Sequence, residues 1–97
     1  MLRHVVLFRW LPDAKPEDVA ALESGLRRMP DLVPEIRRYE MGPDVGLIDG
    51  AYDFALVAEF DDEEGYRAYA DHRDHRELVT ELVGPILDRM ARVQYEV

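Results

Sequence analysis

The chain has 97 residues and a mass of 11.3 kDa, which suffices for one domain spanning 1–97 and is too little for two hydrophobic cores. Its 12 basic and 21 acidic side chains give a net charge of −9, which argues against nucleic acid and against an anionic membrane surface as partners. Cysteine is absent, so disulfides and thiolate-bound metals are excluded. The first apolar run is too short for a signal peptide or a membrane span, and we expect a cytoplasmic protein.

The first predicted element is a strand over residues 2–10. Its middle is apolar on both faces, with His4, Val6 and Phe8 on one and Val5 and Leu7 on the other. A strand of this kind is covered on both sides.

A helix is predicted to begin at Pro16, where proline suits the first turn, and to end at Pro30. Strands are predicted over residues 36–42 and 52–60, joined by the turn-rich segment 42–50.

The acidic run 61–64 stands where the next helix must begin. Asp61 and Glu64 have the capping-box spacing, and a helix N-terminus favours negative charge. The alternative is a Mg²⁺ or Ca²⁺ site built from the carboxylates of this run.

The remaining elements complete an α+β domain. Helical segments are predicted up to about Asp71 and again from about Arg73, with Gly84-Pro85 perturbing the second, and a last strand covers about 90–96. The order β-α-β-β-α-β predicts a ferredoxin-like fold with one four-stranded antiparallel sheet and helices on one face.

The other face of this sheet is too apolar to be left in water. Its expected members are Val5, Leu7, Tyr39, Ala55 and Val57. We therefore predict a homodimer in which two sheets pack face to face.

Three histidines are the candidates for acid–base chemistry near neutral pH. His4 is expected between the sheet and the helices, beside Phe54 and Leu56. The others lie in the segment 69–75, where Tyr69, His72 and His75 are three residues apart. One interpretation is that these side chains converge on one cavity. The alternative is that the segment 69–75 forms a solvated helix surface and that His4 is a core histidine satisfied by a hydrogen bond. A His-x-x-His pair also occurs in zinc sites, but no third ligand is visible at a defined spacing, and we predict no metal.

Several segments together resemble the stress-responsive A/B barrel (Dabb) family. They are HVVLFRW, IRRYEMGPDVG, YDFALVAEFDDEEGYRAY, DHRDH and VQYEV. The resemblance spans nearly the whole chain and implies a ferredoxin-like protomer that dimerises into an α+β barrel.

The resemblance also implies candidate site residues. In the plant olivetolic acid cyclase, a member of the family, a tyrosine and a histidine act without a cofactor, and they match Tyr69 and His75. Two further histidines of that enzyme match His4 and His72. A third-strand histidine falls on Phe54 here, and the proline usual after the first histidine of the motif is Arg73, which favours a continuous helix through 72–76.

Three functions remain open at this point. The first is a small-molecule-binding, stress-associated dimer without catalysis, whose pocket holds an aromatic or polyketide-like ligand between His4, Val6, Phe8, Phe54, Leu56 and His72. The second is a cofactor-independent cyclase or lyase, with His75 as the base and Tyr69 as the hydrogen-bond donor. The third is a monooxygenase or haem-degrading enzyme, which needs Trp10 or a histidine at the reacting group.

Overall fold

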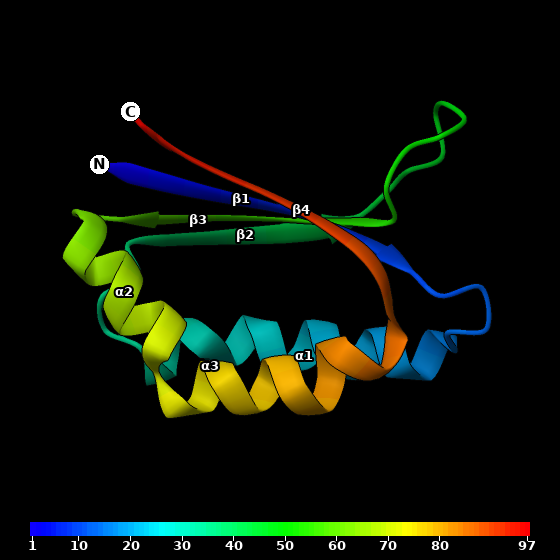
Figure 1. Ribbon diagram of the computed structural model, residues 1–97, viewed down its shortest axis with the longest axis horizontal. Coiled ribbons are helices and arrows are strands. Elements are labelled where there is room, and N and C mark those ends of the chain that lie inside the picture. The colour runs from blue at the N-terminus through cyan, green and yellow to red at the C-terminus, as the bar shows by residue number, and fades with distance from the viewer.

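A four-stranded antiparallel sheet forms one layer of the molecule, and the helices cover one of its faces (Figure 1). The computed structural model describes residues 1–97. The strand order is β2-β3-β1-β4, where the strands are β1 (Leu2–Trp10), β2 (Arg38–Pro43), β3 (Phe54–Phe60) and β4 (Leu87–Glu96). The ferredoxin-like fold is confirmed.

The helical layer consists of one long helix and a broken second one. Its parts are α1 (Pro16–Leu32), α2 (Glu63–Asp71), α3 (Arg73–Leu78), the single π turn η1 (Val79–Val83) and the 3₁₀ turn η2 (Gly84–Ile86). No helix combines the length and the apolar character that crossing a membrane requires.

The first helix runs further than the sequence predicted. Pro30 was expected to end α1 but lies inside it, and the helix continues to Leu32. Proline costs a helix one hydrogen bond and a clash with the carbonyl four residues back. Here the helix continues only two residues beyond the proline, and the bond that closes it is kept, since the Val33 N–H donates to the Met29 carbonyl (2.8 Å).

The cap of α2 differs by one residue from the predicted capping box. Asp62 is the N-cap, and its carboxylate accepts a hydrogen bond from the Gly65 N–H at 2.9 Å. Asp61 is instead held by two hydrogen bonds from the Arg37 guanidinium, at 3.0 and 2.9 Å. The start of this helix is thereby fixed both by its own cap and by the segment that leads into β2.

The helix through 72–76 is not continuous. His72 has an extended backbone conformation (φ −63°, ψ 135°), and it ends α2 and begins α3. Its ring Nδ1 accepts a hydrogen bond from the Asp74 N–H (3.1 Å), so the histidine caps the second helix without the family's usual proline.

The last strand begins earlier than predicted. Gly84-Pro85 perturbs the helical segment as predicted, because the π turn passes there into a 3₁₀ turn that ends at Ile86, and β4 starts at Leu87. Leu87 pairs with Trp10 and Met90 with Phe8, so the early part of β4 extends the antiparallel ladder along β1.

Tyr39 was expected on the open face and lies on the helix-covered one. Its register partner on β3 is Ala58, which is fully buried beside Tyr69. Directly opposed residues of an antiparallel pair share a face, so Tyr39 turns inward while its neighbours Arg38 and Glu40 turn outward.

Candidate functional site

A cavity of about 280 Å³ lies between the sheet and the broken helix. Twelve of its sixteen lining residues are hydrophobic. It is formed by His4, Val6, Phe8, Leu26, Leu56, Tyr66, Tyr69, Ala70, His75, Leu78, Val79, Val83, Gly84, Leu87, Met90 and Arg92. The π turn contributes two valines to this wall, and π turns of this kind are frequent at functional sites.

His4 is a buried polar group in the cavity wall, only 5% exposed. Its Nδ1 accepts a hydrogen bond from the Gln94 side-chain amide at 2.8 Å, which leaves the proton of the neutral ring on Nε2. Burial lowers the pKa of His4 to about 4, and the charges of His75 and Arg92 act in the same direction. At neutral pH His4 is therefore an uncharged hydrogen-bond donor.

Tyr69 extends from α2 and is 1% exposed. Its hydroxyl lies 2.7 Å from the hydroxyl of Tyr39 on β2. Burial raises the pKa of Tyr69 and raises that of Tyr39 to about 12, so both phenols stay protonated at neutral pH. When Tyr39 donates to Tyr69, the proton of Tyr69 is free for another acceptor.

His75 lies against Tyr69, with the ring centroids 4.2 Å apart and the planes inclined by 45°. Its Nδ1 donates to the Ala70 carbonyl at 3.3 Å, so the lone pair of the neutral ring is on Nε2. Burial lowers the pKa of His75, which keeps the ring unprotonated near neutral pH. His75 thus offers an acceptor where His4 offers a donor.

The structure brings six of the eight candidate residues to one cavity, namely His4, Val6, Phe8, Leu56, Tyr69 and His75. Phe54 is not among the lining residues, because its ring packs in the core beside those of Phe8 (6.1 Å) and Trp10 (6.0 Å). His72 is also outside the wall, since its ring is turned to the backbone of Asp74. Trp10, which the monooxygenase or haem-degrading alternative singled out, does not line this cavity either.

Residues that the sequence reasoning missed complete the site. Tyr66 lies one helical turn before Tyr69, with its ring 5.0 Å from that of His4. The strand β4 contributes Met90 and Arg92 to the wall and Gln94 as the partner of His4. Their alternation along β4 was visible in the sequence, but only the pairing of β4 with β1 reveals what they face.

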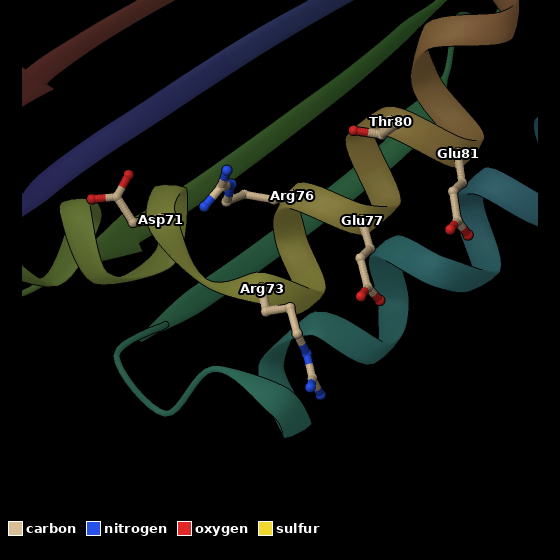
Figure 2. Close-up of a pocket in the computed structure, with 6 residues that line it drawn as sticks. All are labelled: Asp71, Arg73, Arg76, Glu77, Thr80 and Glu81. Carbon is tan, nitrogen blue, oxygen red and sulfur yellow. The ribbon is translucent and has the colours of Figure 1, made fainter.

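A second depression, of about 330 Å³, lies on the outer surface of the broken helix (Figure 2). Its lining is entirely polar, and its side chains, five of them charged, extend from the exposed helix surface: Asp71, Arg73, Arg76, Glu77, Thr80 and Glu81. This surface has the mixed charges of a solvated helix face and lacks an apolar wall.

The acidic run that suggested a cation site has other partners. Asp61 is paired with Arg37 and Asp62 caps α2. No group of three or more histidine, aspartate or glutamate side chains in the chain is placed to hold a metal ion.

Comparison with known proteins places the chain in a family. Residues 2–97 match the sequence profile described as the stress responsive A/B barrel domain, Dabb. No curated protein matches the chain. A dimeric ferredoxin-like protein of unknown function from Thermobifida fusca is 41% identical, with a TM-score of 0.91, and the match covers 99% of this chain and 90% of that one.

More distant structures show the same fold. A protein of Arabidopsis thaliana is 23% identical with a TM-score of 0.87, covering 100% of this chain and 95% of that one. The hydroxynitrile lyase of Passiflora edulis is 15% identical with a TM-score of 0.87, covering 99% and 92%. From the matched profile and the shared fold, the chain belongs to the stress responsive A/B barrel domain (Dabb) family.

Proposed function

We propose that this chain forms a cytoplasmic single-domain homodimer that binds a small aromatic or polyketide-like molecule in the cavity between sheet and helices. The observation that carries the proposal is an apolar wall interrupted by a few uncharged polar groups, among them His4, Tyr69 and His75. Binding sites for small molecules combine an apolar lining with a few placed hydrogen-bonding groups. A volume of about 280 Å³ is at the lower end for such sites and suits a single substituted ring.

The open face of the sheet supports self-association. Along β1 and β3 it carries Val5, Leu7, Ala55 and Val57, all partly exposed. Beside them, the buried carboxylate of Glu59 is paired with Arg3 at 2.7 Å. The 41% identical relative from Thermobifida fusca is described as dimeric, and two apolar sheet faces of this kind bury each other in an isologous contact.

The loop between β2 and β3 rises on the same open side of the sheet (Figure 1). Three of its apolar side chains are 74–84% exposed, namely Val45, Leu47 and Ile48. Apolar groups on this side of the sheet add to the surface that a second copy would cover.

The binding proposal is tested by blocking the cavity. Val79 lines it, whereas the next residue, Thr80, does not. In calorimetric titrations with 4-propylphenol, Val79→Trp should weaken binding at least tenfold because the indole occupies the ligand's space. Thr80→Trp should leave the affinity unchanged, and equal binding by all three proteins would contradict the cavity as the site.

A second candidate function is acid–base catalysis without a cofactor, and the orientation of His75 supports it. Its Nε2 carries the lone pair and is free to take a proton from the carbon next to a ligand carbonyl. The Tyr69 hydroxyl, held by Tyr39, could donate a hydrogen bond to the resulting enolate oxygen. The proton then returns from His75 to carbon or to a leaving oxygen, as a cyclisation or a lyase reaction requires.

Proton exchange distinguishes catalysis from binding alone. With 4-phenyl-2-butanone in D₂O, the wild-type protein should accelerate exchange of the protons next to the carbonyl, as followed by NMR. His75→Asn should abolish the acceleration, whereas His72→Asn, which preserves a side-chain cap, should retain it. Exchange at the uncatalysed rate in the wild-type protein would leave binding as the function of the cavity.

A further inference from the structure

Arg92 is the one residue of the cavity wall with a permanent charge. It lies on the edge strand β4, directly opposite Val6 of β1, and its side chain is exposed. Because the side chain of Arg92 is exposed and also lines the cavity, it lies where the cavity meets solvent. A ligand that enters here contacts the cation and the apolar wall at once.

The side chain of this arginine has no hydrogen bond or ion pair with any group of the protein. Several arginines of the chain are held by carboxylates, as in the pairs of Arg3 with Glu59 (2.7 Å), Arg37 with Asp61 (2.9 Å) and Arg67 with Glu63 (2.7 Å). Arg28, Arg76 and Arg89 also lack such a partner, but none of them lines this cavity. The chain has far more acidic than basic side chains, so the lack of a partner is not due to a shortage of carboxylates. An unpaired guanidinium at the rim of an apolar cavity is suited to bind a negatively charged group of a ligand.

His4 adds a neutral donor beside this cation. Because Val6 is opposite Arg92 and His4 is opposite Gln94, His4 and Arg92 are diagonal neighbours on the same face of two paired strands. The positive charge of Arg92 is one cause of the lowered pKa of His4, so its field reaches the interior of the cavity. An anion between the two would receive hydrogen bonds from the guanidinium and from the Nε2–H of His4.

We propose that the ligand of this cavity carries a carboxylate at one end, held by Arg92 at the mouth, with its apolar end directed toward Phe8 and Leu56. The planar guanidinium matches the two oxygens of a carboxylate, which makes this group the best fit among small anions. The inference rests on the proposed binding function and specifies the chemical class of its ligand.

The test compares two probes of equal size, 4-propylbenzoate and 4-propylbenzamide, by calorimetric titration at pH 7.5. The benzoate should bind the wild-type protein about five- to tenfold more tightly, since hydrogen bonds to a charged acceptor are about twice as strong as neutral ones. Arg92→Gln should remove this preference and change benzamide binding less than about twofold. Arg89→Gln is the matched control, because Arg89 is an exposed arginine of the same strand that does not line the cavity.

The results separate this inference from the binding proposal. Equal affinity of the wild-type protein for both probes would overturn the role of Arg92 while leaving the cavity as a binding site. An equal loss of preference in Arg92→Gln and Arg89→Gln would overturn it too, because total charge and not position would then be responsible. If neither probe bound at millimolar concentration, both proposals would fall.

Discussion

The ring of His75 lies 4.2 Å from the ring of Tyr69, although the two residues belong to different helices. His72, midway between them in sequence, ends α2 and begins α3, and its extended backbone turns the chain there. The hydroxyl of Tyr69 is meanwhile held from the sheet by Tyr39. The proposed acceptor and donor of the cavity are therefore positioned by one helix break and one buried hydrogen bond.

The hydrogen bond between Tyr39 and Tyr69 should contribute measurably to stability. Tyr39→Phe leaves the buried Tyr69 hydroxyl without its partner, and we expect the free energy of unfolding in urea to fall by about 1–3 kcal/mol. Tyr39→Phe/Tyr69→Phe should cost less than the sum of the two single changes, because removing both hydroxyls leaves no unpaired group. Strict additivity would show that the two hydroxyls do not interact.

His4 should make the protein less stable as the pH falls. Its pKa is about 4 in the folded protein and about 6.5 in an unfolded chain. Between these two pH values the His4 ring is protonated only in the unfolded state. The contribution of His4 to the free energy of unfolding should therefore drop by about 3 kcal/mol from pH 7 to below pH 4. Urea unfolding at a series of pH values measures the loss.

The matched variant for this prediction is His4→Phe, which removes the titrating group and keeps an aromatic ring. Acidic side chains titrate in both proteins, so the difference between their two pH profiles isolates His4. The ring protons of His4 in NMR titrations should show a midpoint near pH 4. A midpoint near 6.5 would disprove the effect of burial.

The cap at His72 should be replaceable by another acceptor. His72→Ala removes the group that accepts the Asp74 N–H and should lower the free energy of unfolding by about 1 kcal/mol. His72→Asn restores a side-chain oxygen at the same position and should recover most of that stability. If alanine and asparagine were equally stable there, the cap would have no energetic role.

The open sheet face should determine the oligomeric state. Val57 lies on the central strand β3, and Val57→Asp would bury a charge if two sheets packed together. Light scattering should give about twice 11.3 kDa for the wild-type protein and a monomer mass for the variant. Leu32→Asp, at an exposed site at the end of α1, serves as the control and should remain dimeric. A wild-type monomer at micromolar concentration would refute the dimer.

The order of the elements could be predicted from the sequence because it depends on local patterns. Alternation marked β1 and β3, proline marked the start of α1, and the acidic run marked the start of α2. These patterns together predicted the ferredoxin-like fold, and the placement of His4 on the same face as Val6 and Phe8 followed from alternation alone.

The details of the site depended on contacts between distant segments. Alternation divides a strand into two faces but does not say which one is covered, so Tyr39 could be placed only through its register with Ala58. In the same way, Arg92 acquires its position at the cavity because β4 pairs with β1. The sequence alone determined which side chains share a face of a strand or helix. Only the tertiary structure decided which side chains of different elements are in contact, because those contacts depend on strand register and on packing across the whole chain.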